Sequence, residues 1–516
     1  MDGGARRAAP PRGGRLRRWV PAALAGLVSA GLTLGLAQLV AALVAPSTAP
    51  LAVVGAAFID RTPAWLKDFA IETFGTNDKL ALAVSLVAVI AALAVVAGLA
   101  ARRHLGAGIA LVGLLGAVGV AAALSRPDAT ALSPLPTLVG TAAGIAALVL
   151  LTRRAVRPVA VAPARRSLLI GGVAAVGAVA AGSGRGLEAA RSSEASRAQL
   201  TLPVPADPAP APPPGVNPGV EGLTPYVTPV EDFYRIDTAF LQVPDVRAED
   251  WSLRIHGMVE EEVVLTYADL LAAPLVERWI TLTCVSNEVG GELVGNARWL
   301  GIPLADVLRR AVPSADADML LSRSTDGFTT STTLADVVDG RDALLAIGMN
   351  GVPLPREHGF PVRMIVPGLY GFVSACKWIT EIEVTRFDRA EAYWTKRGWS
   401  PSAPIKTASR IDTPRSFAKV PAGTVTVAGV AWAQNRGVSA VEVRVDDGEW
   451  RRAEVLPSVS EDTWAQWVWR WEDVEPGSYT LRVRATDATG VVQTGETATP
   501  IPDGASGYDT LVFTVV

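Results

Sequence analysis

The chain contains little cysteine and little histidine: of its 516 residues, two are cysteine and three are histidine. A b-type haem between membrane helices usually takes two histidine ligands, and His104 is the only histidine before residue 256. We therefore expect no bis-histidine haem in that part of the chain. The net charge of −3 gives no support for nucleic-acid binding.

Charged residues are absent from five segments of the first 185 residues, which are dominated by Ala, Leu, Val and Gly. The segments cover residues 20–45, 80–101, 105–124, 131–151 and 167–184. Each has about the 17 to 25 residues that a helix needs to cross the hydrocarbon core of a membrane. Pro134 and Pro136 stand near the start of the fourth segment, where a membrane helix tolerates proline best. The sequence therefore predicts about five transmembrane helices within residues 1–185.

Arginine is concentrated in alternate connections of this region. Arginine-rich stretches precede the first segment, separate the second from the third, and separate the fourth from the fifth. By the positive-inside rule the N-terminus is cytoplasmic, and five spans place the rest of the chain outside the membrane. Arg165 and Arg166, directly before the fifth segment, either anchor a helix end or resemble a twin-arginine export signal. A domain that receives a complex cofactor in the cytoplasm needs export in the folded state, so a cofactor site downstream favours the signal.

A linker and a mixed domain are predicted after the membrane region. The linker covers residues 186–222, and it is Pro-rich from Thr201, which favours extended backbone that cannot build a core. Residues 223–408 alternate short strands with short helices. The run from Trp251 has the alternation of a strand, and Thr266 is typical of a helix cap. This mixed order predicts an α+β domain.

The last region, residues 409–516, has the pattern of an all-β domain. Strand-like runs cover residues 425–430, 440–445, 465–471 and 479–485, and Asp446-Asp447-Gly448-Glu449 is typical of a hairpin turn. Repeated short strands predict a β-sandwich. Trp467, Trp469 and Trp471 fall on one face because side chains alternate along a strand. Packing in a core or at a sheet edge is the favoured interpretation of this stripe, whereas an exposed stripe would favour a subunit interface.

Cys284 is the most informative position of the chain. It follows an apolar, β-prone stretch and opens a Gly-rich loop, so a sulfur stands at a strand end beside flexible backbone. A metal ligand or a nucleophile is often held in this way. Spacing alone also allows a buried, inert cysteine. A disulfide with Cys376 is a further alternative, since an external compartment permits one.

Several motifs follow one another in a fixed order around this cysteine. They are Asp232-Phe-Tyr-Arg235-Ile-Asp, Thr-Leu-Thr-Cys284, Arg323-Ser-Thr-Asp326-Gly, Arg356-Glu-His358-Gly-Phe-Pro-Val-Arg363 and Ser374-Ala-Cys-Lys377-Trp. Each alone is explained as readily by surface charges or turn residues. Together, over residues 233–407, they resemble the molybdenum-cofactor domain of the sulfite oxidase family. The resemblance also implies that the C-terminal sandwich is an immunoglobulin-like domain that mediates dimerisation.

The resemblance implies a molybdenum–molybdopterin cofactor and a role for each motif. Cys284 would be the metal ligand, and Arg235 would approach the metal. The remaining cofactor-binding residues would be Ser324, Asp326, His358, Arg363, Ser374 and Lys377. Arginine suits this task because its planar, always charged fork can bind two phosphate oxygens at once.

Two departures from the family pattern concern the substrate. Sulfite oxidases carry an arginine five residues after the metal-binding cysteine, and this chain has Val289 there. They place a tyrosine near the metal five residues after a tryptophan, and counting from Trp394 this chain has Trp399. Loss of a cation and a phenol weakens the case for a small dianion such as sulfite. A tryptophan at this position is more like the bacterial periplasmic branch of the family.

The remaining pocket residues are predicted from their place near Cys284. Arg235, Asn287, Glu288 and Trp399 are expected to shape the substrate pocket. Glu288 is the only acid within residues 281–291, so it is either a proton donor or a solvated carboxylate.

The sequence therefore predicts a multi-domain, membrane-anchored molybdopterin-dependent oxidoreductase that transfers an oxygen atom to or from a small external molecule. Its expected partners are that substrate, the membrane, a separate electron-transfer protein and a second copy of the chain. One alternative is a non-catalytic surface protein that keeps the enzyme fold as a binding module. A sensor or transport accessory is disfavoured, because the spans contain no ionisable residue of the kind that marks a conduction path.

Overall fold

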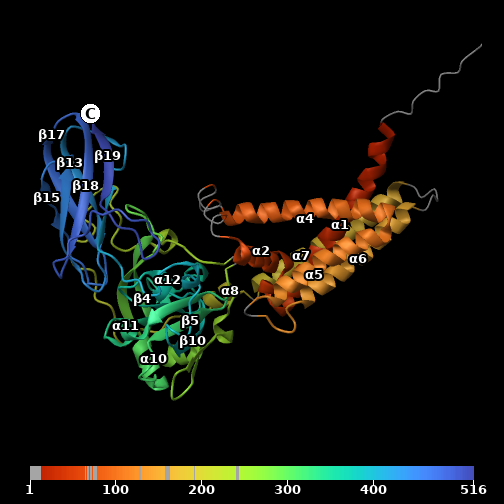
Figure 1. The fold of residues 1–516 in the computed structure, drawn as a ribbon, viewed down its shortest axis with the longest axis horizontal. Coiled ribbons are helices and arrows are strands. Elements are labelled where there is room, and N and C mark those ends of the chain that lie inside the picture. The colour runs from red at the N-terminus through yellow and green to blue at the C-terminus, as the bar shows by residue number, and fades with distance from the viewer. Residues whose placement is uncertain are drawn as a thin grey trace, which may run out of the picture. The chain divides into compact units, whose positions relative to one another are not determined.

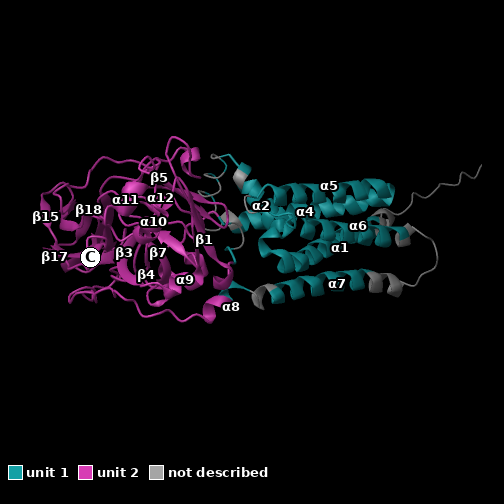
Figure 2. Ribbon diagram, turned by 90° about the horizontal axis from the view of Figure 1, so that it is seen from below, with its two compact units in different colours: residues 1–195, 239–245 teal, residues 196–238, 246–516 magenta. Residues whose placement is uncertain are grey.

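The computed structural model describes residues 13–63, 66, 69, 73, 78–126, 129–156, 163–190, 192–239 and 243–516. Side chains of residues 13–18, 60, 78–79, 154–156, 163–169 and 188–190 are not described. Arg165 and Arg166 lie near the start of the helix that begins at Pro163. Their side chains are among those not described, so the prediction of an export signal lies outside the described residues. The chain divides into two compact units, which Figure 2 colours separately. Unit 1 comprises Met1–Ala195 and Ala239–Asp245, and unit 2 comprises Ser196–Thr238 and Val246–Val516.

Unit 1 is helical, as its apolar composition predicts (Figure 1). Its long helices are α1 (Gly13–Val44), α4 (Asp78–Arg103), α5 (Leu105–Leu124), α6 (Leu135–Val156) and α7 (Pro163–Ala190). All five are long and apolar enough to cross a membrane. The connection after α1 also contains a helix that the sequence analysis did not predict, α2 (Pro50–Arg61).

Glycines allow the helices of unit 1 to approach one another closely. A Cβ atom on Gly35 of α1 would lie 2.3 Å from the carbonyl oxygen of Gly177 in α7, and one on Gly26 would lie 1.9 Å from that of Ala94 in α4. Small residues at such crossings are how helices associate in an apolar solvent, where burial of apolar surface contributes little. The helix α1 therefore packs against α4, α6 and α7.

Unit 2 begins with an α+β region built on two sheets. The first sheet has the order β2 (Val263–Thr266), β1 (Ser252–Gly257), β10 (Ile379–Thr385), β5 (Met319–Ser324) and β6 (Thr329–Thr333). The second has the order β3 (Val276–Thr283), β4 (Val294–Pro303), β7 (Leu344–Met349) and β8 (Val352–Pro353), with β9 (Arg363–Ile365) also paired to β7. The helices are α9 (Tyr267–Ala272), α10 (Leu304–Ala311), α11 (Leu334–Val338) and α12 (Gly371–Ser374). Thr266 caps α9 through a reciprocal capping box with Asp269, as predicted.

The C-terminal part of unit 2 is a pair of β-sheets. One has the order β11 (Ala408–Thr413), β13 (Gly423–Trp432), β17 (Ala465–Val474) and β16 (Glu454–Val455). The other has the order β12 (Lys419–Val420), β19 (Asp509–Val515), β18 (Gly477–Asp487), β14 (Val438–Val445) and β15 (Trp450–Arg452). Trp467 is fully buried in the core between the sheets, and Trp469 and Trp471 pack against that core. The core interpretation of the tryptophan stripe is thus confirmed.

The Pro-rich segment is not a free spacer along its whole length. Ala206 donates to the carbonyl of Leu275, and Asp207 forms a parallel bridge with Val276 at the start of β3. The indole of Trp279 donates to the carbonyl of Pro210. Proline-rich backbone has few donors of its own, but its carbonyls remain good acceptors at the edge of a sheet. The segment therefore lies along β3.

Candidate active site

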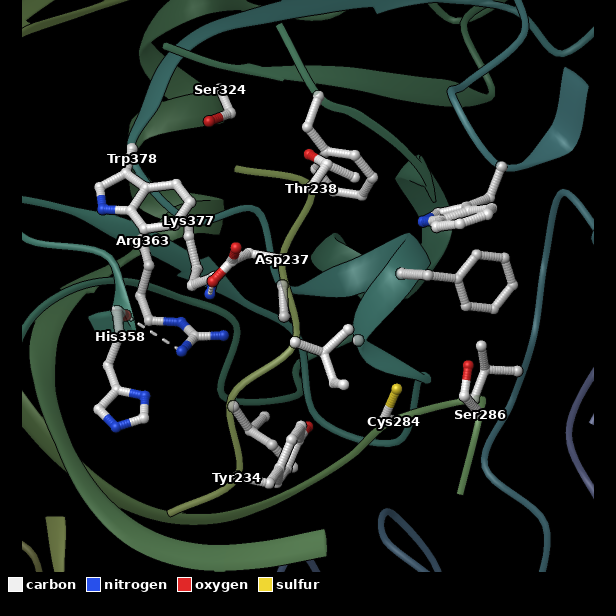
Figure 3. A pocket seen from close by; sticks show the side chains of 18 of the residues that line it. Tyr234, Asp237, Thr238, Cys284, Ser286, Ser324, His358, Arg363, Lys377 and Trp378 are labelled. Carbon is white, nitrogen blue, oxygen red and sulfur yellow. Dashed lines mark hydrogen bonds and ion pairs between the residues drawn. The ribbon is translucent and has the colours of Figure 1, made fainter. Parts of the chain in front are cut away.

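A pocket in unit 2 gathers residues from five separate stretches of the chain. The stretches are residues 233–238, 282–286, 324–328, 358–378 and 394–399. In Figure 3, Cys284 and Ser286 lie on one side of the pocket, His358, Arg363 and Lys377 on the other, and Asp237 between them. The chain motifs that were separate in sequence therefore meet in one cavity.

Cys284 lies where the buried strand β3 ends. Its backbone N–H donates to the carbonyl of Leu293, and its own carbonyl accepts from Asn287, which closes a tight turn. The side chain is 8% exposed, and burial raises the pKa of the thiol. Both cysteines are free, so the disulfide alternative with Cys376 is contradicted. A bound metal cation would stabilise the thiolate form of Cys284 and so favour loss of the thiol proton despite burial.

The opposite side of the pocket is cationic and buried. Arg363, at the start of β9, is 5% exposed, donates to the carbonyl of His358 and lies over the ring of Trp299. No carboxylate in the described part of the chain pairs with it, and its Nε is buried without a hydrogen-bond partner there. Burial lowers the pKa of Arg363 to about 10. A buried guanidinium without a carboxylate partner destabilises the folded protein unless a bound anion pairs with it.

His358 and Lys377 share this environment. Burial, aided by the charges of Arg363 and Lys377, lowers the pKa of His358 to about 4, so its imidazole is neutral at pH 7. Burial also lowers the pKa of Lys377 to about 8. The ammonium of Lys377 lies 3.1 Å from Asp237, whose side chain is 2% exposed. The Lys377 charge is therefore partly compensated, whereas that of Arg363 is left for a ligand.

A hydroxyl and a carboxylate lie at the turn between β5 and β6. Asp326 accepts from the backbone of Phe328 and from the hydroxyl of Thr238, and Ser324 accepts from the backbone of Asp326. Both Ser324 and Asp326 line the pocket. These groups can donate to and accept from a polar heterocycle.

The lining also contains a group of aromatic side chains that are half-buried. Phe372 and Trp399 have ring centroids 5.6 Å apart, and Trp394 and Trp399 have centroids 6.0 Å apart. All three line the pocket. Apolar walls exclude water and favour neutral groups.

Four of the predicted site residues lie outside the lining. Arg235 has a side chain that is 43% exposed and donates to Asp237, whose own side chain is 2% exposed. Glu288 is exposed on the loop after Cys284. Ser374 donates to the carbonyls of Leu369 and Tyr370, which occupies its hydroxyl. Asn287 likewise turns away from the pocket to accept from Leu293.

The sequence analysis missed several lining residues, chiefly Tyr234, Asp237, Thr238, Phe372 and Trp378. Tyr234 and Asp237 flank Arg235 in a motif that was already singled out. Alternation along an extended segment could have found Tyr234, which precedes the exposed Arg235, but it would place Asp237, two residues after Arg235, on the exposed side. Burial, with a further contribution from Cys284, raises the pKa of Tyr234.

Comparisons with known proteins identify this architecture. The model of the oxidoreductase molybdopterin binding domain matches residues 240–394, and that of a bacterial Ig domain matches residues 408–492. An uncharacterised oxidoreductase, YuiH, of Bacillus subtilis is 32% identical over 149 residues, which cover 29% of this chain and 72% of that protein. The chain belongs to the sulfite oxidase family of molybdopterin oxidoreductases.

Within the sulfite oxidase family, mitochondrial sulfite oxidase of Mus musculus is 32% identical over 288 residues, covering 48% of this chain and 52% of the relative. Sulfite oxidase of Arabidopsis thaliana is 28% identical over 271 residues, covering 43% and 68%. The chain thus spans about half the length of the mitochondrial relatives it matches. The crystal structure of the sulfane dehydrogenase SoxCD of Paracoccus pantotrophus has the same fold, with a TM-score of 0.50 and 22% identity over 57% of this chain and 84% of that one.

The residues of this pocket fit the family's cofactor. The buried, unpaired Nε of Arg363 and the nearby Lys377 suit a phosphate, and the groups near Asp326 suit a pterin ring. Cys284 offers the soft thiolate that a molybdenum centre takes from a protein. When bound, the cofactor supplies two-electron redox chemistry. The protein's own contribution would be to hold the cofactor's charge with Arg363 and Lys377, and to exclude water with the aromatic side chains of the lining.

The pKa of Lys377 predicts how anion uptake depends on pH. Because this pKa is lowered to about 8, Lys377 is charged below pH 8 and loses its charge as the pH rises through it. Binding of sulfate, which does not itself titrate here, to apo protein should weaken about tenfold between pH 7 and pH 9.5, as expected for loss of one charged hydrogen bond. Calorimetric titration measures this, and Lys377→Arg should abolish the loss. A wild-type affinity that does not change with pH would contradict the assignment.

Proposed function

We propose that this chain is a membrane-anchored molybdenum enzyme that catalyses two-electron oxygen-atom transfer on a small, uncharged molecule outside the cytoplasm, and that sulfite is not its substrate. One observation carries the proposal. Among the described lining residues the cations are Arg363 and Lys377, and both are buried on the side that suits the cofactor. An anionic substrate in this pocket therefore meets no cation dedicated to it.

The proposed position of the enzyme in the cell is supported by unit 1. Five apolar helices support membrane anchoring, and the arginine-rich alternate connections support a cytoplasmic N-terminus with unit 2 outside. Residues 1–255 contain a single histidine, His104, which supports electron exchange with a separate protein instead of a bis-histidine haem in this chain. The immunoglobulin-like domain is the part that we propose to form a homodimer.

A substrate screen tests the proposed chemistry. Cofactor-loaded protein would be assayed with a redox dye against sulfite, S-oxides and N-oxides. Turnover of a neutral oxide at a rate well above that of sulfite is the expected result. Brisk oxidation of sulfite would refute the proposed specificity.

Installing the family's residues should change the specificity. The double variant Val289→Arg, Trp399→Tyr restores the cation and the phenol of sulfite oxidases. Its kcat/KM for sulfite should rise about tenfold or more, since a hydrogen bond to a charged group contributes about 1.5 to 3 kcal/mol. The control Val289→Met, Trp399→Phe changes the same positions without adding either group and should leave sulfite turnover unchanged. An equal rise in both variants would contradict the electrostatic explanation.

A further inference from the structure

The strand that ends on Cys284 is held by the immunoglobulin-like domain. β3 is at one edge of its sheet, so its outward N–H and C=O groups need partners from elsewhere. Thr281 donates its N–H to the carbonyl of Asp462, and its hydroxyl accepts from the N–H of Trp464. Gln434 donates through Nε2 to the carbonyl of Thr281 at 3.1 Å and to the hydroxyl of Thr283 at 3.0 Å. The contacts continue to the residue directly before Cys284.

The other end of the Cys284 loop is held by the same domain. The guanidinium of Arg410 donates to the carbonyl of Gly291 at 2.8 Å and pairs with Asp412, and both of these side chains are buried. Gly290 has a φ of +74°, and a Cβ there would lie 2.6 Å from Asp509 of β19. The immunoglobulin-like domain therefore contacts the chain on both sides of Cys284: at the end of β3 and at the end of the loop.

The chemistry of these contacts points to positioning. Gln434 is fully buried, yet its Oε1 has no hydrogen-bond partner within the described part of the chain. An unpaired buried acceptor costs stability, which an apolar side chain of the same size would avoid. Apolar packing already joins the two domains, because Val430, Trp432 and Trp464 belong to the enzyme domain's buried cluster. The hydrogen bonds that Gln434 donates are therefore not needed to hold the two domains together. They instead fix the orientation of the end of β3 relative to the immunoglobulin-like domain.

We propose that the immunoglobulin-like domain is a positioning element of the active site, with Gln434 and Arg410 as the positioning residues. The inference rests on the proposed function. The thiol stands where an edge strand of the enzyme domain ends, and the last residues of that strand and the loop after it have their outer partners in the immunoglobulin-like domain. A shift of about 1 Å in a reacting group can cost about a hundredfold in rate. Fixing both sides of the loop keeps the sulfur at its place opposite Arg363 and Lys377.

A pair of matched substitutions tests the proposal. Gln434→Met removes the donor with little change in volume. Gln493→Met is the control, because Gln493 is also buried but bonds to Ser409, Ala485 and Gly507 inside the immunoglobulin-like domain. Thr283→Val, which removes the acceptor from the other partner, serves as a second test variant in case Gln434→Met does not fold.

The first readout uses apo protein and needs no substrate. Alkylation of Cys284 is followed by mass spectrometry at fixed pH, with the fully buried Cys376 as internal reference. We expect about a tenfold faster reaction of Cys284 in Gln434→Met and in Thr283→Val, and no change in Gln493→Met, because only the first two release the strand. In loaded enzyme, kcat should fall by about ten- to a hundredfold with KM little changed. Unchanged alkylation in both test variants, or an equal increase in Gln493→Met, would overturn the proposal even if the substrate assignment holds.

Discussion

Cys284→Ser should abolish turnover while leaving the fold intact. The substitution replaces a soft thiolate by a hard hydroxyl of similar size, and the buried site offers no other cysteine in its lining. Removal of a group that acts directly on a reacting centre typically costs about 10³-fold or more in kcat. Metal analysis, X-ray absorption at the molybdenum edge and activity would be measured on cofactor-loaded protein. We expect one sulfur ligand fewer in the variant.

Cys376→Ala is the matched control for this experiment. Cys376 is equally free and fully buried, but it does not line the pocket. The control should keep its molybdenum and most of its activity, with at most a modest loss of thermal stability from the small cavity. Absence of molybdenum from wild-type protein expressed with cofactor supply, or full activity of Cys284→Ser, would contradict the role of this residue.

Arg363→Met should stabilise the apo protein and weaken cofactor retention. The folded state lowers the pKa of Arg363 from 12.5 to about 10, so the folded protein holds this proton less firmly than the unfolded chain. The resulting destabilisation is fully present below pH 10 and disappears only as the pH rises through the unfolded value. At pH 7 its removal should raise the free energy of unfolding by about 3 to 4 kcal/mol, since the pKa falls from 12.5 to about 10 and each pKa unit corresponds to about 1.4 kcal/mol.

The holo protein should respond in the opposite direction. Loss of a buried fork that suits a phosphate should reduce cofactor occupancy at least about tenfold. Arg298→Met is the control, because Arg298 also lies over a tryptophan ring, that of Trp279, but pairs with Glu277 outside the pocket. That control should retain its cofactor and lose a little stability. The melting temperature of apo protein and the cofactor content of loaded protein test these two predictions. A melting temperature of apo Arg363→Met below that of the wild type would contradict the first.

Local patterns were sufficient for the elements and for much of the candidate site. Uncharged runs predicted five long helices, and alternation predicted strands such as β1 and β13, because burial in lipid or in a sheet selects residue types over a short window. The motifs that contain Cys284, Asp326, His358, Arg363 and Lys377 could be singled out in sequence because each depends on a few neighbouring residues, and the structure brings all five residues into one pocket.

Other predicted site residues proved wrong because their roles depend on the direction in which each side chain of an irregular segment points. Arg235 and Asp237 stand two residues apart in one motif, yet the first is exposed and the second is buried in the pocket. Glu288 follows Cys284 closely but points to solvent, since the tight turn after the cysteine redirects the chain. Residue type and spacing do not determine such directions.

The sequence by itself determined that this protein has five long apolar helices, a family-type cofactor domain around Cys284 and a β-sandwich, because those features depend on local composition and motif order. Only the tertiary structure decided that Gln434 and Arg410, more than a hundred residues away in the chain, bind the strand and loop of that cysteine. The physical reason is that hydrogen bonds across an edge strand are set by the docking of one domain on another. Docking depends on the summed shape and polarity of both surfaces, which no local window contains.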